Sequence, residues 1–146
     1  MLSIEHFKSI MEKIEGKADI LYFHVMGEPL LHPDLALFIA LANEKKFKVH
    51  ITTNGSLLKN AQEQLRHSKL KRLNISLQSI EQFPQEERKK KTLEILEASQ
   101  NLLKTNPELF ISLRLWTQDR TAFSEEIASY IESFFSFPFG KIRASL

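Results

Sequence analysis

The stretch His24-Val25-Met26-Gly27-Glu28-Pro29-Leu30-Leu31-His32-Pro33-Asp34 marks the end of a strand, a sharp turn and the beginning of a helix. The apolar residues 20–25, which include Tyr and Phe, predict the strand that leads into the turn. Pro33 suits the first position of a helix, where no backbone donor is needed. Glu28 is the one carboxylate of the turn itself, and it follows the strand at the place where parallel strands present their functional groups.

Helical and extended patterns alternate along the rest of the chain. Ser3 is a candidate N-cap, and apolar residues at helical spacing follow it up to Gly16. Further helices are expected over residues 33–46, 57–67, 84–106 and 121–135, and further strands over residues 48–53, 72–77 and 109–115. Residues 78–83 are expected to form a loop, and residues 141–145 alternate as the beginning of a fifth strand would. Because a helix separates every pair of consecutive strands, the sheet is predicted to be parallel.

The two faces of the predicted strands differ in polarity, since side chains alternate along a strand. One face is uniformly apolar and carries Leu21, Phe23, Val25, Val49, Ile51, Leu73, Ile75, Leu77, Ile111, Leu113 and Leu115. The opposite face is polar or mixed and carries Tyr22, His24, Met26, His50, Thr52, Asn54, Asn74, Ser76, Gln78, Phe110, Ser112, Arg114 and Trp116. The strands of a doubly wound sheet are apolar on both faces, so this pattern predicts helices on one side only.

These strand faces predict an α/β fold in which a partial parallel (β/α) barrel has helices on its outer face and a polar inner wall. A sheet with one face in water is the alternative. A solvated face would normally carry Lys and Glu, whereas this one carries Asn, Ser, Gln, Thr and His with a single arginine. Short hydrogen-bonding side chains of this kind suit an enclosed pocket.

Parallel barrels bind ligands at the carboxyl ends of their strands. Four segments are expected there, namely the turn at 26–29, Asn54-Gly55, residues 76–79 and residues 114–116. Gly27 lets a ligand approach the backbone, and Glu28 is able to accept a hydrogen bond from an ammonium group. Arg114 is able to hold a carboxylate through two parallel hydrogen bonds, and Ser76 and Gln78 are suited to hydroxyl or carboxylate groups. The set suits a zwitterionic, polar small molecule.

Each of these segments also has a purely structural interpretation. Asn54-Gly55 is a common turn sequence, the turn at 26–29 has a shape that needs no ligand, and Arg114 has possible partners within the sheet. His24, Glu28 and His32 recur at intervals of four residues, but they straddle a strand end and a turn, so no metal site is predicted. The chain has no pattern for a nucleophile with its base, a phosphate-binding loop or a dinucleotide site, so no catalytic residue is predicted.

The composition is that of one ordinary globular domain, with 146 residues, 42% hydrophobic and 26% charged. A formal net charge of +2 gives no indication of a nucleic-acid partner. The chain contains no cysteine, which excludes disulfides and thiolate metal sites. No apolar run reaches the roughly 18 residues of a membrane span, and no secretory signal precedes the first helix, so we expect no membrane contact and a cytoplasmic location.

Three motifs follow one another at the predicted strand ends: MGEPLLHPDL at 26–35, ITTNGSLL at 51–58 and LNISLQS at 73–79. Their order and spacing resemble the radical S-adenosylmethionine (radical SAM) superfamily, in particular the branch with a Gly-Gly-Glu-Pro turn followed by Leu-Leu-His-Pro. The resemblance extends from about Leu2 to the end of the chain, and Asn54 belongs to the family's Thr-Asn-Gly strand end. It implies a partial (β/α)6 barrel in which the four strands are family strands two to five and residues 141–145 begin the sixth.

The resemblance also implies a cofactor, S-adenosylmethionine (SAM), and residues that bind it. The turn after the second family strand contacts the amino group of the methionine moiety, which implicates Gly27 and Glu28. Polar residues of the fourth family strand approach the carboxylate or the ribose, which implicates Ser76 and extends to Gln78. Arg114 corresponds to an arginine on the next strand that contacts the cofactor in some members.

The sequence departs from the family pattern at two places. Met26 stands where the first glycine of the turn usually lies. The three-cysteine motif, which holds a [4Fe-4S] cluster after the first family strand, is missing, so this chain cannot ligate that cluster conventionally. We therefore expect residues 1–146 to be a single truncated barrel domain. It would be the core of an enzyme that in complete form cleaves SAM reductively at the cluster to generate a substrate radical, and it is expected to be inactive by itself.

Two other functions stay open from the sequence. One is a cluster-free module that binds a small molecule or another protein without catalysis, and the other is a βα domain without a ligand. Lacking the first family strand, the strand at 20–25 would have an unpaired edge. Phe134, Phe135, Phe137 and Phe139 would also lack part of their packing. We therefore expect self-association or poor solubility of the isolated chain.

Overall fold

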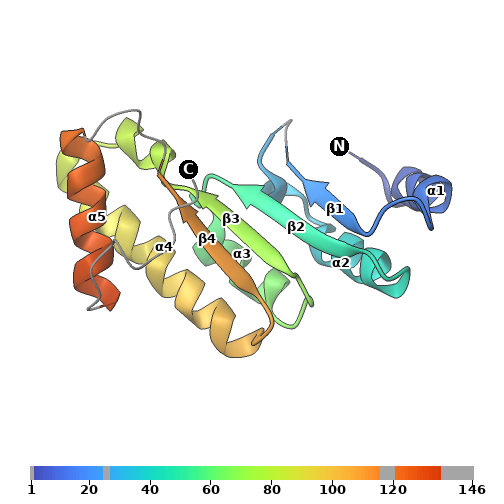
Figure 1. Ribbon diagram of the computed structural model, residues 1–146. Coiled ribbons are helices and arrows are strands. Elements are labelled where there is room, and N and C mark those ends of the chain that lie inside the picture. The colour runs from blue at the N-terminus through green and yellow to red at the C-terminus, as the bar shows by residue number, and fades with distance from the viewer. Residues whose placement is uncertain (1, 25–26, 116–120, 136–146) are drawn as a thin grey trace.

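The computed structural model describes residues 2–24, 27–115 and 121–135, which form an α/β domain around a four-stranded parallel sheet. The strands are β1 (Ile20–Phe23), β2 (Lys48–Thr53), β3 (Arg72–Ser76) and β4 (Phe110–Arg114). The helices are α1 (Ile4–Ile14), α2 (Leu35–Glu44), α3 (Leu58–Leu65), α4 (Gln85–Thr105) and α5 (Ala122–Phe135), with short 3₁₀ helices η1 (Pro29–Leu31) and η2 (Leu77–Gln82). The strand order is β1-β2-β3-β4 (Figure 1), which confirms the predicted fold class of a partial parallel barrel.

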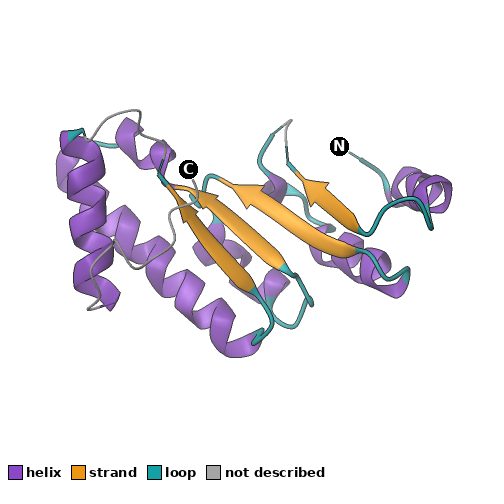
Figure 2. Cartoon of the chain, in the orientation of Figure 1, coloured by secondary structure: helices purple, strands orange, loops and turns teal. Residues whose placement is uncertain are grey.

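The core lies between the sheet and its helices. Phe23, Ile51, Leu73 and Ile111 are register partners across the four strands and form one row of the predicted apolar face. The central members of this row are fully buried, and α2 and α3 lie behind the strands in Figure 2. The apolar face is therefore the helix-covered face, as predicted. Within the described part of the chain, no helix combines the length and the apolar composition that crossing a membrane requires.

Helix α1 packs at the β1 end of the sheet. Ser3 caps it by accepting a hydrogen bond from the backbone N–H of His6 at 3.2 Å, as predicted. Phe7 stacks on Phe38 of α2 with ring centroids 4.3 Å apart, and it meets Phe23 of β1 edge-on at 5.9 Å. These aromatic contacts hold α1 against α2 and β1, so β1 is covered on its apolar face although it is the first strand of the sheet.

The inner face of the sheet carries two arginines, not the single arginine expected from the sequence. Arg72 opens β3 and is the register partner of His50 and Phe110, so it belongs to this face. Its guanidinium lies 4.6 Å above the Phe110 ring. Arg114 lies at the opposite end of the face, beside Ser76. The inner face thus carries an arginine at each end, on Phe110 where β3 and β4 begin and beside Ser76 where they end.

The main differences from the predicted elements lie on either side of the strand ends. The helix predicted from Pro33 begins at Leu35, and the preceding turn forms η1, because the Glu28 side chain accepts a hydrogen bond from Leu30 N–H and caps it. The predicted loop at 78–83 is largely the 3₁₀ helix η2. Val25, Met26, Trp116 and the predicted fifth strand at 141–145 lie outside the described residues.

Strand β1 leaves one edge of the sheet open, since among the described residues it pairs only with β2. Its four residues include no charge and no proline, and Tyr22 is 57% exposed. Such edges pair readily with other strands. We therefore expect the chain to associate with itself as its concentration rises, and a Tyr22→Lys substitution to shift its sedimentation profile toward the monomer.

A Leu103→Lys substitution is the matched control, because Leu103 is a 40% exposed apolar residue on α4, far from β1 in the sequence. It should leave the association unchanged. A monomer at all concentrations for the unaltered chain would contradict the expectation. Of the terminal phenylalanines, Phe134 and Phe135 are half-buried and contact each other, and Phe137 and Phe139 lie outside the described residues.

Candidate functional site

The carboxylate of Glu28 joins the turn after β1 to the end of β2. Its Oε1 accepts hydrogen bonds from the Thr53 hydroxyl at 2.6 Å and from the Leu30 N–H at 3.1 Å. Its Oε2 accepts one from the Asn54 N–H at 2.9 Å. Hydrogen bonds to an ionised acceptor are stronger than those between neutral groups. The predicted ammonium acceptor is therefore already used by three donors of the protein, which leaves little of it free for a ligand.

Asn54 extends this connection to the end of β3. Its backbone carbonyl accepts a hydrogen bond from the Ser79 hydroxyl at 2.8 Å, and the same hydroxyl lies 3.1 Å from the Ser76 carbonyl. Its side-chain oxygen accepts from Ser56 N–H at 2.8 Å and from the Ser56 hydroxyl at 2.6 Å. We call the set Glu28, Thr53, Asn54, Ser76 and Ser79 the strand-end network. It brings together three segments that are well separated in the sequence.

Gly27 is exposed at the rim of the strand-end network. Its φ of +105° is one that residues with a side chain rarely adopt, and a Cβ placed there would meet nothing within 4 Å. The glycine is therefore required by the backbone conformation, and the space beside it is open to a ligand. The approach of a ligand to the Gly27 backbone stays a prediction.

Gln78 and Arg114 lie next to Ser76. Arg114 is the register partner of Ser76 on β4, and both are half-buried on the inner face. Gln78 donates through Nε2 to the carboxylate of Glu81 at 2.5 Å, and its Oε1 is buried without a hydrogen-bond partner in the described structure. A buried oxygen of this kind can accept a hydrogen bond from a ligand. The register thus brings Ser76 and Arg114 together, and Gln78 follows in η2; contact of the three with a cofactor stays a prediction.

Farther down the inner face, two more side chains have unused polar atoms. Asn74 is 2% exposed and donates to Thr52 Oγ1 at 3.3 Å, while its own oxygen has no partner among the described residues. The Nδ1 atom of His50 is likewise buried without a hydrogen-bond partner among the described residues. Burial lowers the pKa of His50 below its usual 6.5, and the charges of Arg72 and Lys48 lower it further, so the site favours the neutral imidazole.

Sequence reasoning missed Thr53. It was expected only as a strand residue, yet its hydroxyl makes the shortest hydrogen bond to Glu28. A signal was present, because Thr53 is the register partner of Ile75 and therefore stands on the otherwise apolar face. A polar residue on a buried face needs a partner, which is a reason to look for one at the adjoining turn.

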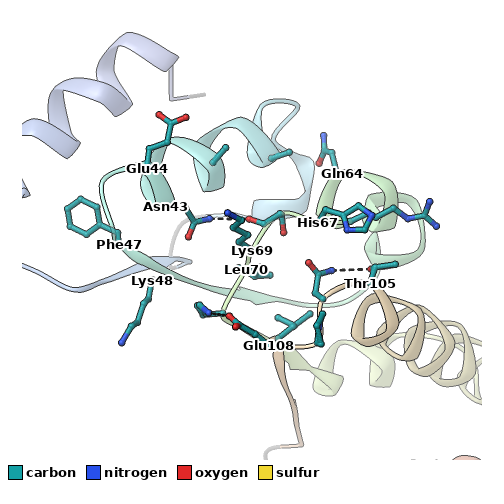
Figure 3. Close-up of a pocket in the computed structure, with 18 of the residues that line it drawn as sticks. Asn43, Glu44, Phe47, Lys48, Gln64, His67, Lys69, Leu70, Thr105 and Glu108 are labelled. Atoms are coloured by element: carbon teal, nitrogen blue, oxygen red, sulfur yellow. Dashed lines mark hydrogen bonds and ion pairs between the residues drawn. The ribbon is translucent and has the colours of Figure 1, made fainter.

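Two hollows lie at opposite ends of the strands. The smaller, of about 440 Å³, is lined by residues of α1, β1, η1 and α2 and includes Gly27 and Glu28. The larger, of about 1080 Å³, lies where β2, β3 and β4 begin (Figure 3). Of the two, only the smaller one borders the strand-end network, through Glu28, and its lining includes none of Asn54, Ser76, Gln78 and Arg114.

The larger hollow has a structural explanation. Its basic lining is Lys46, Lys48, Arg66, His67, Lys69 and Lys71. α2, α3 and α4 all end at this hollow, and cations are favourable beside the carboxyl ends of helices. Lys46 and His67 have φ values of 66° and 60° and lie two residues beyond α2 and α3, where helices commonly end in a left-handed residue. Both the charge and the backbone conformation follow from the helix ends.

The described side chains around Glu28 do not suit a metal ion or an iron–sulfur cluster. His32 contacts the Leu2 carbonyl at 3.0 Å through Nε2 and accepts from the Asp34 N–H at 3.1 Å through Nδ1, and Glu28 is held by its three donors. No group of three His, Asp or Glu side chains able to hold a metal ion occurs in residues 2–24, 27–115 and 121–135. A [4Fe-4S] cluster needs cysteine thiolates, and the chain contains no cysteine.

Comparison with known proteins supports the motif-based assignment. The radical SAM superfamily profile matches residues 1–112. The GTP 3',8-cyclase of Campylobacter jejuni (strain RM1221) is 47% identical over 57 residues, which are 38% of this chain and 18% of that protein. The probable GTP 3',8-cyclase of Methanocaldococcus jannaschii is 40% identical over 55 residues, which are 37% of this chain and 18% of that protein. The match thus covers about a fifth of each relative. Because the family profile covers most of the chain, this protein belongs to the radical SAM superfamily.

Proposed function

We propose that this chain is the SAM-binding core of a radical SAM enzyme, with the methionine moiety of SAM beside the Gly27-Glu28 turn. The supporting observation is the strand-end network, which holds this turn against β2 and β3 in a chain of this family. Glu28 holds the turn in place, and the exposed backbone of Gly27 faces the ligand. An ammonium group needs hydrogen-bond acceptors, and backbone carbonyls of the turn supply them.

The neighbouring side chains suit the rest of the cofactor. The guanidinium of Arg114 matches the methionine carboxylate, which it can bind through two parallel hydrogen bonds. We assign the unpartnered Oε1 of Gln78 to a ribose hydroxyl, and Ser76 is the register partner of Arg114. These contacts orient SAM and exclude water from it.

The cluster lies outside this proposal, because no residue of the chain supplies a thiolate. In a complete enzyme of this family a cluster would supply an electron for SAM cleavage, and its thiolate ligands would have to come from residues other than these. The relatives are named GTP 3',8-cyclases, but the chain covers only 18% of them. We therefore propose cofactor binding here and no substrate.

A cluster-free binding module is the second candidate, and the absence of cysteine favours it. The two candidates differ in affinity. A module that has lost its redox chemistry should hold SAM tightly without iron, whereas an enzyme core that lacks the contacts of a cluster should hold it weakly. Isothermal titration of SAM into the iron-free chain separates the two.

Amide shifts in the ¹⁵N spectrum of the chain test the binding site. SAM and free methionine are both expected to move the amides of Gly27, Glu28 and Asn54, and adenosine is expected to leave Gly27 unmoved. Arg114→Ala should lower the SAM affinity about tenfold, since it removes charge-assisted hydrogen bonds. The matched control is Arg72→Ala, which removes an inner-face arginine at the other end of β3 and should leave the affinity unchanged.

Two results would overturn the assignment. One is a SAM titration that moves only amides around the larger hollow, such as those of Lys48 and Lys69. The other is an equal loss of affinity in the Arg72 and Arg114 variants, because this would mean that the cofactor is not held at the carboxyl ends of the strands.

A further inference from the structure

The Thr53 side chain both donates and accepts a hydrogen bond at the strand-end network. It is 2% exposed and lies on the helix-covered face of the sheet, at the end of β2. Its hydroxyl donates to Glu28 Oε1 at 2.6 Å and accepts from the Gly55 N–H at 3.0 Å. Both bonds have the geometry of good hydrogen bonds, and a hydroxyl has one proton to donate. That one proton goes to Glu28.

The carboxylate of Glu28 is held from both sides of the turn. Leu30 lies in η1, and Glu28 is the N-cap of this 3₁₀ helix. The hydrogen bond from Leu30 N–H therefore shapes the turn itself. Thr53 and Asn54 belong to the end of β2, so their bonds fix the turn relative to the sheet. Of these two, Thr53 is the only side-chain donor, and it makes the shorter bond.

We propose that Thr53 is a positioning residue for the cofactor turn, and this inference rests on the proposed function. By donating to Glu28, the hydroxyl sets the place of the exposed Gly27 backbone relative to Ser76 and Arg114. Thr53 itself is 2% exposed, so it offers almost no surface to a ligand. Its effect on SAM binding passes through Glu28.

Four variants test this role by SAM titration. Thr53→Val keeps the shape and removes the hydroxyl, and it should weaken SAM binding about tenfold. Thr53→Ser keeps the hydroxyl and should bind SAM within about twofold of the unaltered chain. Thr53→Ala serves where the valine variant does not fold. The matched control is Thr92→Val, because Thr92 is fully buried on α4 and its hydroxyl donates only to the Arg88 carbonyl. It should not change SAM binding.

Amide hydrogen exchange without SAM provides a readout that is independent of the proposed function. In Thr53→Val, the amides of Leu30 and Asn54 should exchange about tenfold faster, because both donate to the carboxylate that Thr53 holds. In Thr53→Ser and Thr92→Val these rates should not change. If the unaltered chain fails to bind SAM, the proposed function is wrong, and the exchange rates still decide whether Thr53 positions the turn.

The positioning role is wrong if Leu30 and Asn54 exchange at unaltered rates in Thr53→Val. It is also wrong if Thr53→Ser fails to restore binding, because the shape of the side chain and not its hydroxyl would then matter. Equal losses in Thr53→Val and Thr92→Val would show a general effect of removing a buried hydroxyl.

Discussion

Replacing Gly55 with alanine is expected to lower the free energy of unfolding by about 3 kcal/mol, from backbone strain and overpacking together. Gly55 has a φ of +78°, which favours glycine, and it lies directly after β2 at the strand-end network. A Cβ at this position would lie 2.9 Å from Ile75 Cγ2 and 3.0 Å from Ile95 Cδ1. Ile75 is fully buried and Ile95 is 5% exposed, so the added methyl group would press on side chains of the core.

The matched control for this substitution is Gly16→Ala. Gly16 has a similar φ of +73°, but a Cβ there would meet nothing within 4 Å. The free energy of unfolding of Gly16→Ala should therefore fall only by the cost of the left-handed backbone, about 1 kcal/mol. Urea denaturation of the two variants measures the difference between them. Equal losses would mean that the core beneath Gly55 yields without cost.

Replacing Glu28 with alanine is expected to lower the free energy of unfolding by about 3 kcal/mol, because it leaves three donors without their acceptor. Loss of the hydrogen bond from the Thr53 hydroxyl should cost the most, because this hydroxyl is buried. Glu28→Gln keeps the size of the side chain and one acceptor oxygen, so its loss should be smaller. Thermal and urea denaturation measure both variants.

Glu12→Ala is the control for the loss of a carboxylate as such, because Glu12 is exposed on α1. It should change the stability by less than about 0.5 kcal/mol. If Glu28→Ala is no less stable than Glu12→Ala, the three hydrogen bonds of Glu28 contribute nothing to the fold. The turn at Gly27 would then have to be held by η1 alone.

Alternation along the strands suffices to predict most of this architecture. Ile51 and Leu73 alternate with His50 and Asn74, and this pattern alone separates the helix-covered face from the inner face. The same reasoning places Ser76 and Arg114 side by side. It succeeds because burial of one face of a parallel sheet determines which residues are neighbours across it.

The position of the Glu28 carboxylate could not be predicted in this way. Turn residues have no periodicity, and the sequence alone does not indicate that Leu30, Thr53 and Asn54 donate to one side chain. The formation of η1 at Pro29 ahead of the helix at Leu35 depends on the same carboxylate. Contacts that turn residues make with distant strand ends emerge only when the sheet has assembled.

The strand order has a consequence for how the chain acquires its structure. Every strand pairs with the strand that precedes it in the sequence, with one helix between them. Among the four described strands no pairing waits for a distant segment, so each closure spans only one helical crossover. On a ribosome, β2 can dock onto β1 as soon as both have emerged, and later strands can be added in the order of their synthesis. Growth by successive addition also leaves the most recently added strand with an open edge at every stage, in addition to the edge of β1, until the next strand covers it.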